Sequence, residues 1–592
     1  MCGIFGYVGR KGQTSEMILE GLKLLEYRGY DSWGIAVKSP TSNNKSQIVV
    51  NKQIGKIGSA KVDLPESEIG IGHTRWATHG GVTQENSHPH LDCSSRIAVV
   101  HNGIIENYSE IKEDLIKKGH KFISETDTEV FPHLVEENLK SASFEDAFLK
   151  SFNRIKGLNA IVAIDSETNS LAAAKTGSPL IIGLGENEYF ISSDPSGVAN
   201  HTQKALFLKD NEMVVLDENL RLVSLPNGEI LDPYFETLEK NVKDEGLGKY
   251  EHYMIKEIYE QPEVLENLAS NLSAEIEKLG HEIKNAYGTY FIGAGTAYFA
   301  CLMGAYLFSK IAKVHVNHAP ASEFNYLEDF LTKKSLIIAL SQSGETIDIV
   351  EPLERAKRTK GSKIFAITNV KGSTIYRLSD LKLILGAGSE KAVASTKAYI
   401  AKLGILLELA FSMNGEINTG RELVESAAKE IKRILEEENV SNIKKIASFL
   451  NSKEHMFILG RGPSYSSALE GALKIREVSY LHAEGLAGGE LKHGAIALIS
   501  KGTPCIVFAP NDETYSAIMS NAMEVKARGG VIIGVSHMNS DIFDHFIEVK
   551  DIKEGSLVAQ IVPLQLIAYY LALLKNLDPD KPRNLAKSVT VK

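Results

Sequence analysis

Cysteine is scarce in this chain, which has four cysteines among 592 residues. They are far apart, form no CxxC pair and lack the spacing of metal ligands: Cys2, Cys93, Cys301 and Cys505. A disulfide framework is therefore not expected in a protein of this length, and neither is a metal site. Free cysteines are usually buried as small apolar side chains, so only Cys2 attracts attention, because of its position.

Three further features are missing, and each excludes a class of function. The formal net charge is −10 and no concentrated basic face is visible, so we expect no nucleic-acid partner. We identify no apolar run of about 18 residues and no signal-peptide pattern, so we expect no membrane partner and a cytoplasmic protein. No complete GxGxxG fingerprint is present, and no nicotinamide, flavin or pyridoxal cofactor is expected.

The patterns that are present indicate several domains, because 592 residues are too many for one hydrophobic core. Residues 2–230 mix a helix over 16–27 with strands over 35–37, 97–100, 160–164 and 189–192. The charged, glycine-containing segment 231–250 is interpreted as a linker. From about residue 280 strands and helices alternate, which is typical of a parallel sheet covered by helices.

The second half of the chain contains an internal repeat. Segment 290–298 reads YFIGAGTAY, segment 457–465 reads FILGRGPSY, and matching residues continue into the following helix at the same offset. Each unit is an apolar strand, a glycine turn and a helix. We therefore predict two tandem α/β domains, 280–425 and 447–582, joined by a charged helical connector over 429–438.

The N-terminus carries the first candidate catalytic group. Removal of Met1 would leave Cys2 with a free α-amine. One residue then holds a thiol nucleophile and a base with a pKa of about 7.7–8.0, which is the minimum for acyl transfer. Because any protein can begin Met-Cys, this signal needs support from other segments.

Five downstream segments supply that support. In order they read RGYDS (28–32), HTRWATHG (73–80), NSHPH (86–90), VHNGI (100–104) and ETDTE (125–129). Their residues and order closely resemble class II glutamine amidotransferase domains. The resemblance implies an α+β N-terminal-nucleophile hydrolase fold with αββα layers, which hydrolyses the side-chain amide of glutamine.

The same resemblance implies roles for individual residues. Cys2 would attack the amide, while Asn102 and the Gly103 N–H would form the oxyanion hole, where donors meet charge that develops in the transition state. Arg75 would bind the carboxylate of glutamine and Asp127 its α-ammonium group. The rest of the glutamine site would come from Trp76, which would also gate the passage of ammonia, and from Thr78 and His79.

Structural roles are the alternative for several residues of these segments. Trp76 could be a core aromatic residue and Arg28 a structural ion-pair partner. For His88 and His90 we favour hydrogen-bonded positions in the core.

A hydroxyl-rich loop marks the second candidate site. Strand 336–340 leads into SQSGET (341–346) and the start of a helix. Hydroxyls and backbone N–H groups at a helix N-terminus bind phosphate, although a capped helix after a polar turn is the alternative. The equivalent positions of the second repeat, 507–510, read VFAP and carry no hydroxyl. We therefore expect a phosphate loop in the first repeat alone.

These features resemble the sugar isomerase (SIS) domain. The resemblance implies two tandem α/β SIS domains with parallel sheets and a sugar-phosphate site. Matching positions for phosphate and sugar contacts are Thr296, Ser341, Gln342, Ser343, Thr346, Val393 and Ser395. One position departs from the family pattern, because Ala297 stands where many members have serine. Its backbone N–H could still contribute.

The second repeat carries candidate acid–base groups. Glu470, Lys474 and Glu477 share one helical face by their i, i+4, i+7 spacing. A solvated ion-pair face is the alternative. Segments HAE (482–484) and GELKHG (489–494) and the tail 582–592 count against it, because they resemble the glutamine–fructose-6-phosphate aminotransferase family.

That resemblance implies conversion of glutamine and fructose 6-phosphate to glutamate and glucosamine 6-phosphate. Lys587, in the tail 583–592, would form a Schiff base with the C2 ketone, and Glu477 would move the proton between C1 and C2. Lys474 would stabilise the enolate, and His493 would open the sugar ring in a neighbouring subunit. A channel that excludes water would carry ammonia to the sugar. The family also implies at least a homodimer.

Two other functions stay open on the sequence. The glutaminase could serve another sugar-phosphate acceptor, whereas a simple deglycase would not need it. A non-catalytic sensor of sugar phosphates would not need Cys2, Glu477, His493 and Lys587 together. Glucosamine formation from free ammonia would distinguish an enzyme from a sensor.

Overall fold

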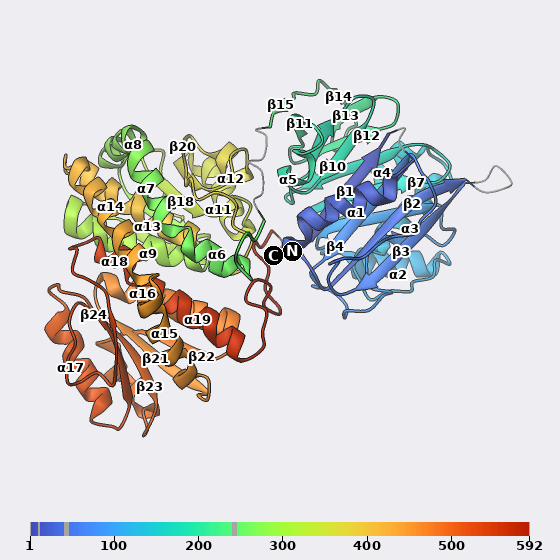
Figure 1. Cartoon of the computed structure of the whole chain (residues 1–592). Coiled ribbons are helices and arrows are strands. Elements are labelled where there is room, and N and C mark those ends of the chain that lie inside the picture. The colour runs from blue at the N-terminus through green and yellow to red at the C-terminus, as the bar shows by residue number, and fades with distance from the viewer. Residues whose placement is uncertain (1, 10–11, 41–45, 239–245, 591–592) are drawn as a thin grey trace. The chain divides into compact units, whose positions relative to one another are not determined.

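The computed structural model describes residues 2–9, 12–40, 46–238 and 246–590 (Figure 1). Its contacts divide the chain into two compact units. One comprises residues 1–244 together with 588–592, and the other comprises residues 245–587. The first unit contains two antiparallel sheets, and the second contains two parallel sheets.

The first sheet of the N-terminal unit has the strand order β15-β11-β9-β10-β1-β4-β2-β3. Its strands are β1 (Gly3–Val8), β2 (Ser32–Pro40), β3 (Ser46–Ile54), β4 (Ile69–Arg75), β9 (Ile181–Leu184), β10 (Tyr189–Ser192), β11 (Lys204–Phe207) and β15 (Glu236–Thr237). The second sheet has the order β14-β13-β12-β8-β7-β6-β5. Its strands are β5 (His90–Leu91), β6 (Ile97–Gly103), β7 (Asn159–Asp165), β8 (Leu171–Thr176), β12 (Glu212–Leu216), β13 (Leu220–Ser224) and β14 (Ile230–Leu231).

Side chains alternate along these strands, so each sheet has two faces. One face of each sheet packs against the other sheet, and the opposite face packs against helices. Ile4 of the first sheet and Val100 of the second share one apolar cluster, so these two faces meet. On the outer face of the first sheet, Phe5 packs in a cluster with α1 (Thr14–Leu25). On the outer face of the second, Ile97 packs with α2 (Tyr108–Lys117), α3 (Val130–Leu139) and α4 (Phe144–Arg154). The layers are αββα, which confirms the predicted fold class.

Most predicted elements of this unit are present, but its predicted end is too early. The expected helix is α1 followed by a 3₁₀ turn (Glu26–Arg28), and the four expected strands are β2, β6, β7 and β10. The predicted linker 231–250 is partly sheet, because β15 pairs with β11 and the Leu238 N–H donates to the Gln203 carbonyl over 2.7 Å. Strands of two residues show no periodicity, so the sequence pattern missed them. Residues 239–245 of the predicted linker lie outside the described residues.

Each parallel sheet of the C-terminal unit has five strands in the same order. The first is β17 (Asn317–Pro320), β16 (Thr289–Gly293), β18 (Leu336–Ser341), β19 (Lys363–Thr368) and β20 (Leu381–Ile384). The second is β22 (His482–Ala487), β21 (His455–Gly460), β23 (Pro504–Ala509), β24 (Val531–Ser536) and β25 (His545–Glu548). The two glycine turns also match, because Gly295 and Gly462 have φ of 54° and 52°. This agreement confirms two tandem α/β domains.

Helices surround both sheets and fill the space between them (Figure 1). The helices of the first repeat and of the segment before it are α6 (Tyr253–Tyr259), α7 (Gln261–Asn271), α8 (Ser273–Asn285), α9 (Thr296–Leu307), α10 (Ala321–Phe324), α11 (Ile347–Lys360), α12 (Thr374–Leu378) and α13 (Lys397–Met413). The remainder are α14 (Ile417–Ile434), α15 (Glu437–Leu450), α16 (Pro463–Ser479), α17 (Tyr515–Lys526), α18 (Ser556–Ala559) and α19 (Val562–Leu574). The predicted connector 429–438 spans the end of α14 and the start of α15.

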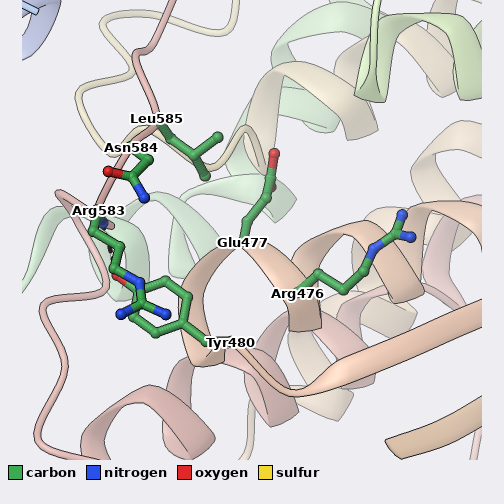
Figure 2. A pocket seen from close by; sticks show the side chains of 6 residues that line it. All are labelled: Arg476, Glu477, Tyr480, Arg583, Asn584 and Leu585. Atoms are coloured by element: carbon green, nitrogen blue, oxygen red, sulfur yellow. Dashed lines mark hydrogen bonds between the residues drawn. The ribbon is translucent and has the colours of Figure 1, made fainter. Parts of the chain in front are cut away.

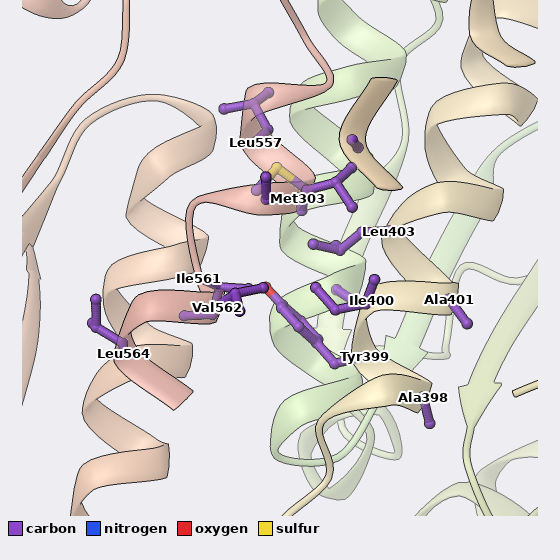
Figure 3. Close-up of a cluster of buried hydrophobic side chains, with 14 of the residues drawn as sticks. Met303, Ala398, Tyr399, Ile400, Ala401, Leu403, Leu557, Ile561, Val562 and Leu564 are labelled. Atoms are coloured by element: carbon purple, nitrogen blue, oxygen red, sulfur yellow. The ribbon is translucent and has the colours of Figure 1, made fainter. Parts of the chain in front are cut away.

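One hydrophobic core is shared by the two repeats. Helix α13 is buried along nearly its whole length, and its Tyr399 and Leu403 belong to the same cluster as Met303 of α9 and Ile561 and Leu564 near the start of α19. Figure 3 shows Met303, Tyr399, Leu403 and Ile561 gathered between the three regions. The repeats are therefore separate sheets around a common apolar centre.

One segment departs from the expectation that no apolar run is long enough to span a bilayer. Residues Lys553–Leu574, which include α18 and α19, are sufficiently long and apolar, and 83% of the tested stretch is buried inside the protein. An apolar helix that is buried all round is the ordinary form of a core helix in a large domain. The segment packs in the shared core described above.

Candidate active sites

Cys2 lies directly before β1, beside the residue that follows β4. Its Sγ lies 3.4 Å from the Trp76 nitrogen and 3.6 Å from the Trp76 carbonyl oxygen. Burial raises the pKa of the Cys2 thiol, while the Trp76 N–H and the Arg75 guanidinium act in the opposite direction. A thiol in this state needs a nearby base before it can act as a nucleophile.

The end of β6 places Asn102 and Gly103 next to Cys2. Asn102 Nδ2 donates to the Cys2 carbonyl over 3.0 Å, and Asn102 Oδ1 lies 3.1 Å from His73 Nε2. Only glycine fits at 103, because φ is +140° and a Cβ would lie 2.4 Å from the Leu158 carbonyl oxygen. An amide has two N–H groups, so Asn102 keeps one for a ligand while the other holds Cys2.

Arg75 and Asp127 are both buried, and each is held by backbone groups. Arg75 donates to the carbonyls of Gly80 and Gly81 over 3.2 and 3.0 Å, which shapes the loop that follows β4. Asp127 accepts from the Ile105 N–H over 2.7 Å. Arg75 has five N–H donors, so these contacts leave capacity for a carboxylate.

The other residues of the predicted glutamine site belong to the same loop, which follows β4. Trp76 and His79 are half-buried, and Thr78 is exposed. The His79 ring meets the Tyr108 ring edge-on at 5.2 Å. The loop is thus accessible at Thr78 and anchored at His79.

Two anchors of this loop were quoted in the sequence motifs but received no role. Asp31 Oδ2 accepts from the Ala77 N–H over 2.8 Å. Asn86 donates to Glu125 Oε2 and to the Gly81 carbonyl, each over 3.0 Å. Asp31, Asn86 and Glu125 lie in three of the five matching segments, which was the available signal.

His88, His90 and Arg28 have structural roles, which was one of the two interpretations that the sequence allowed. His88 stacks on His73 with ring centroids 4.1 Å apart, and His90 Nε2 lies 3.1 Å from the Thr126 hydroxyl. Burial lowers the pKa of His88 and of His90 well below the usual value, so both are neutral. Arg28 is buried in an ion pair with Asp194.

In the C-terminal unit, the hydroxyl-rich loop forms a tight turn between β18 and α11. Ser341 Oγ accepts from the Gly344 N–H over 2.9 Å, and Ser343 Oγ accepts from the Glu345 N–H over 3.1 Å. Thr346 occupies the N-cap position of α11, and its side chain makes no capping hydrogen bond. The Ser341 hydroxyl, which accepts in this turn, keeps its hydrogen for a ligand. The side chains of Gln342, Ser343 and Thr346 are half-buried.

Thr296 faces the other repeat, which the motif did not predict. Its hydroxyl donates to Glu470 Oε1 over 3.2 Å. The neighbouring Ala297 is buried in the shared core. The two glycine turns thus bring the start of α9 against the acid–base helix α16.

The charged face of α16 is buried, which excludes the solvated alternative. Lys474 Nζ lies 2.5 Å from Glu477 Oε2 and 3.6 Å from Glu470 Oε1. The side chains of Lys474 and Glu470 are 1% and 0% exposed, while that of Glu477 is 19% exposed. Burial raises the pKa of Glu470 to about 7, against the attraction of Lys474. Glu477 is the carboxylate of this group that a ligand can reach.

Lys587 of the tail ends in a buried ion pair with Glu390. The Nζ–Oε2 distance is 2.6 Å, and the side chains are 3% and 0% exposed. Glu390 also accepts from the Ser395 hydroxyl over 3.0 Å and from the Thr396 N–H over 2.9 Å. Val393 donates its N–H to the Asp580 carbonyl over 2.9 Å. The loop that contains Val393 and Ser395 therefore positions the tail lysine.

Sequence reasoning missed three further ionisable groups of this region: buried Glu257 and Lys402, and half-buried Asp580. Burial raises the pKa of Glu257, whose Oε1 accepts from the Ala392 N–H over 3.1 Å. Burial lowers the pKa of Lys402, in the middle of α13, to about 8. The Asp580 carboxylate accepts from the first two N–H groups of α6 over 2.8 and 2.7 Å. A lysine inside the apolar run of α13 was the one visible signal.

A cavity of about 270 Å³ opens between the end of α16 and the tail. Arg476, Glu477, Tyr480, Arg583, Asn584 and Leu585 line it. Figure 2 shows the Arg583 guanidinium stacked on the Tyr480 ring, with Glu477 reaching up beside Leu585. The backbone N–H of Arg583 donates to the Tyr480 hydroxyl over 2.7 Å. Glu477 thus faces an open pocket that is lined in part by the segment preceding Lys587.

His493 is not part of this group. It lies in a 3₁₀ turn (Glu490–His493) after β22, and its side chain is exposed. Among the residues that the structure describes, it makes no hydrogen bond or ion pair. A role in the site would have to come from outside its own repeat, as the sequence analysis expected.

Comparison with known families agrees with this division of sites. The glutamine amidotransferase domain model matches residues 73–199, and the SIS domain model matches residues 282–413 and 449–575. Fold, sites and family models together define an amidotransferase in which a glutaminase domain is joined to a pair of SIS domains.

Full-length relatives identify the family. The glutamine–fructose-6-phosphate aminotransferases (isomerizing) of Pyrococcus horikoshii and Clostridium tetani are each 42% identical to this chain, and the alignments cover both partners completely. A solved C-terminal domain of the aminotransferase from Francisella tularensis is 34% identical, with a TM-score of 0.53 over 57% of this chain and all of that one. The chain belongs to the glutamine–fructose-6-phosphate aminotransferase (isomerizing) family, as the sequence motifs predicted.

Proposed function

We propose that this enzyme converts fructose 6-phosphate and glutamine to glucosamine 6-phosphate and glutamate, the first step towards activated amino sugars. The N-terminal unit hydrolyses glutamine, and the C-terminal unit aminates and isomerises the sugar. Ammonia is the intermediate that passes between them, so it must be kept from protonation and loss to water on the way. The full-length relatives and the two distinct buried sites support this proposal.

In the proposed glutaminase reaction, Cys2 attacks the side-chain amide once Met1 has been removed. Its α-amine takes the thiol proton, and Asn102 Nδ2 and the Gly103 N–H stabilise the oxyanion. Arg75 binds the carboxylate of glutamine, and Asp127 binds its α-ammonium. The side chains of Trp76, Thr78 and His79 enclose the substrate.

In the proposed sugar reaction, the turn between β18 and α11 binds the phosphate through its side-chain hydroxyls and the N–H groups at the start of the helix. Its residues are Ser341, Gln342, Ser343 and Thr346. Thr296, which donates to Glu470, joins the phosphate group only if its hydroxyl turns towards the ligand. Val393 and Ser395 lie along the sugar.

Lys587 is the proposed Schiff-base lysine, and Glu477 the group that moves a proton between C1 and C2. Formation of the Schiff base needs a neutral amine, and the contact with Glu390, 2.6 Å from Nζ, holds the Lys587 side chain in position for it. Lys474 stabilises the enolate oxygen, because its ammonium is buried against the two glutamates. His493 opens the sugar ring of a second copy of the chain.

The observation that carries the proposal is the buried Lys587–Glu390 pair beside a cavity that Glu477 lines. A sugar-phosphate sensor would not need a buried amine held by a carboxylate. Fructose 6-phosphate is the proposed ketose because the full-length relatives are named for it.

The test is an assay of both products with wild-type protein and Cys2→Ala. Wild type should form glutamate and glucosamine 6-phosphate from glutamine and fructose 6-phosphate. Cys2→Ala should form the amino sugar only when ammonium is added. Glutamate without amino sugar would leave the glutaminase assignment standing and overturn the proposed acceptor.

We further propose a cytoplasmic homodimer, with the glutaminase domain over residues 2–238 and SIS domains over 280–425 and 447–582. Exposed His493, which has no partner in its own repeat within the described part of the chain, supports the dimer. Sedimentation of the intact protein tests it, because a monomer that remains fully active would contradict a role for His493 across subunits.

A further inference from the structure

We propose that the N-terminal unit contains a structural zinc site formed by Cys93, His120, His133 and Glu136, separate from the glutamine site. The four side chains each present one ligand atom, and these atoms lie within 4.8 Å of one another. Nothing in the proposed glutaminase reaction uses them. The spacing of the four cysteines predicts no metal site, because Cys93 has no second cysteine near it in the sequence.

Three separate segments meet at this cluster. Cys93 lies in the turn between β5 and β6, and His120 follows α2. His133 and Glu136 are one turn apart on α3, so they share a helical face. Ligands from a turn, a loop and a helix form no short motif, which is why the sequence pattern did not reveal them.

The distances between the ligand atoms fit a tetrahedral metal ion. Zinc bonds of about 2.0–2.3 Å at tetrahedral angles separate neighbouring ligand atoms by about 3.3–3.6 Å. Cys93 Sγ lies 3.6 Å from His133 Nδ1 and 3.9 Å from His120 Nδ1. Glu136 Oε2 lies 3.0 Å from His120 Nδ1 and 3.4 Å from His133 Nδ1. Four edges of the tetrahedron are therefore already close to their final length.

The outer nitrogen of each histidine faces a carboxylate, which is an independent observation. His120 Nε2 lies 3.1 Å from Glu137 Oε2, and His133 Nε2 lies 3.8 Å from Glu129 Oε1. Histidines that bind zinc through one nitrogen commonly donate the other N–H to a carboxylate, which fixes the tautomer. Both rings have their Nδ1 atoms directed at the cluster; His120 Nε2 is within hydrogen-bond distance of its carboxylate, whereas His133 Nε2 lies near Glu129 without a hydrogen bond.

Backbone groups support the two anionic ligands in the same way. The Lys121 N–H donates to Cys93 Sγ over 3.4 Å, and the Cys93 N–H donates to Glu136 Oε2 over 3.2 Å. A thiolate and a carboxylate gain from such donors, whereas a neutral thiol has little need of one. One thiolate with two imidazoles favours zinc over magnesium or calcium, which prefer oxygen ligands.

A bound ion would cross-link the segments that lead to the glutamine site. Glu129, which faces His133, also accepts from the N–H groups of Ile123 and Ser124 over 2.7 Å each. Asp127 lies between these residues in the chain. Zinc would therefore hold the loop that presents Asp127, and its role would be structural, because all four ligand positions come from the protein.

The experiment uses the full-length chain without a histidine tag, stripped with a chelator and then titrated with Zn²⁺ or Co²⁺. We expect one metal ion per chain by elemental mass spectrometry. Cobalt should give the visible bands of a tetrahedral site and a near-ultraviolet thiolate band. Zinc should also raise the midpoint of thermal unfolding, because it binds the folded state.

Variants separate this site from other thiols and carboxylates. Cys93→Ser should abolish the thiolate band and weaken zinc binding by more than about 10-fold, and Glu137→Gln should weaken it by about 10-fold while keeping the band. Cys2→Ala and Glu113→Gln, an exposed acid on α2, are matched controls that should bind as wild type does. A wild-type chain that binds no stoichiometric metal, or a Cys93→Ser chain that binds equally well, would overturn the site in favour of hydrogen-bonded histidines.

Discussion

Replacing Glu390 by glutamine should release the tail that carries Lys587. The two charges are 2.6 Å apart and nearly inaccessible to water. Their attraction at an effective dielectric constant of about 20 is about 6 kcal/mol, but desolvation offsets part of it. Removal of one partner from a buried pair costs about 3–5 kcal/mol. Because the tail can move Lys587 into water, we expect this cost to appear as local opening of the tail.

The measurement is hydrogen exchange of the backbone amides of residues 583–587, followed by mass spectrometry. A loss of about 3 kcal/mol predicts exchange more than about 100-fold faster in Glu390→Gln than in wild type. Lys587→Met should open the tail as well, and the double variant should fall short of the sum by about 3 kcal/mol. Unchanged exchange in Glu390→Gln, or additive losses, would refute the reasoning.

The same pair predicts a pH dependence. Burial would raise the pKa of Glu390, but Lys587 outweighs it and lowers the pKa from 4.5 to about 2. A carboxylate with a lowered pKa contributes stability that is complete above its ordinary value and is lost as pH falls towards the folded value. The wild-type tail should therefore stay docked at pH 5 and open between about pH 4.5 and 2, relative to Glu390→Gln.

Three other substitutions probe the two sites. Gly103→Ala places a Cβ 2.4 Å from the Leu158 carbonyl oxygen. Glutamine-dependent synthesis should therefore fall by about 100-fold or more while ammonia-dependent synthesis continues, and equal loss of both would contradict the oxyanion role. Asp580→Ala removes the acceptor for the first N–H groups of α6 and should cost about 1–2 kcal/mol, seen as faster proteolysis after residue 577; an unchanged rate would count against it. Lys402→Met removes an ammonium whose pKa burial lowers to about 8, so calorimetry at pH 7 should show a gain of about 3 kcal/mol. That gain should shrink between pH 8 and about 10.5, and a pH-independent gain would mean that packing, not charge, is responsible.

Local patterns in the sequence predicted the scaffold well. Three short-range signals each lie where expected. They are the hydroxyl-rich loop after β18, the two glycine turns, and the helical spacing of the charged residues in α16. They depend on neighbours within a few residues, so tertiary context does not change them.

Contacts between distant segments could not be predicted in the same way. Glu390 and Lys587 are 197 residues apart, and each alone resembles an ordinary surface charge. Thr296 matched the phosphate motif, but folding places its hydroxyl against Glu470. Burial decides which charges meet, and burial of a charged residue follows from the whole fold rather than from its neighbours in sequence.

The matched glycine turns at Gly295 and Gly462 show what the two repeats share and where they differ. Both adopt the same left-handed backbone, yet only one lies beside a hydroxyl-rich loop, and the other introduces the buried charges of α16. The turn is thus a property of the shared scaffold and not of a ligand. In the proposed reaction the first repeat holds the substrate and the second transfers the proton, so the apolar core that the two repeats share fixes the substrate-binding half against the acid–base half.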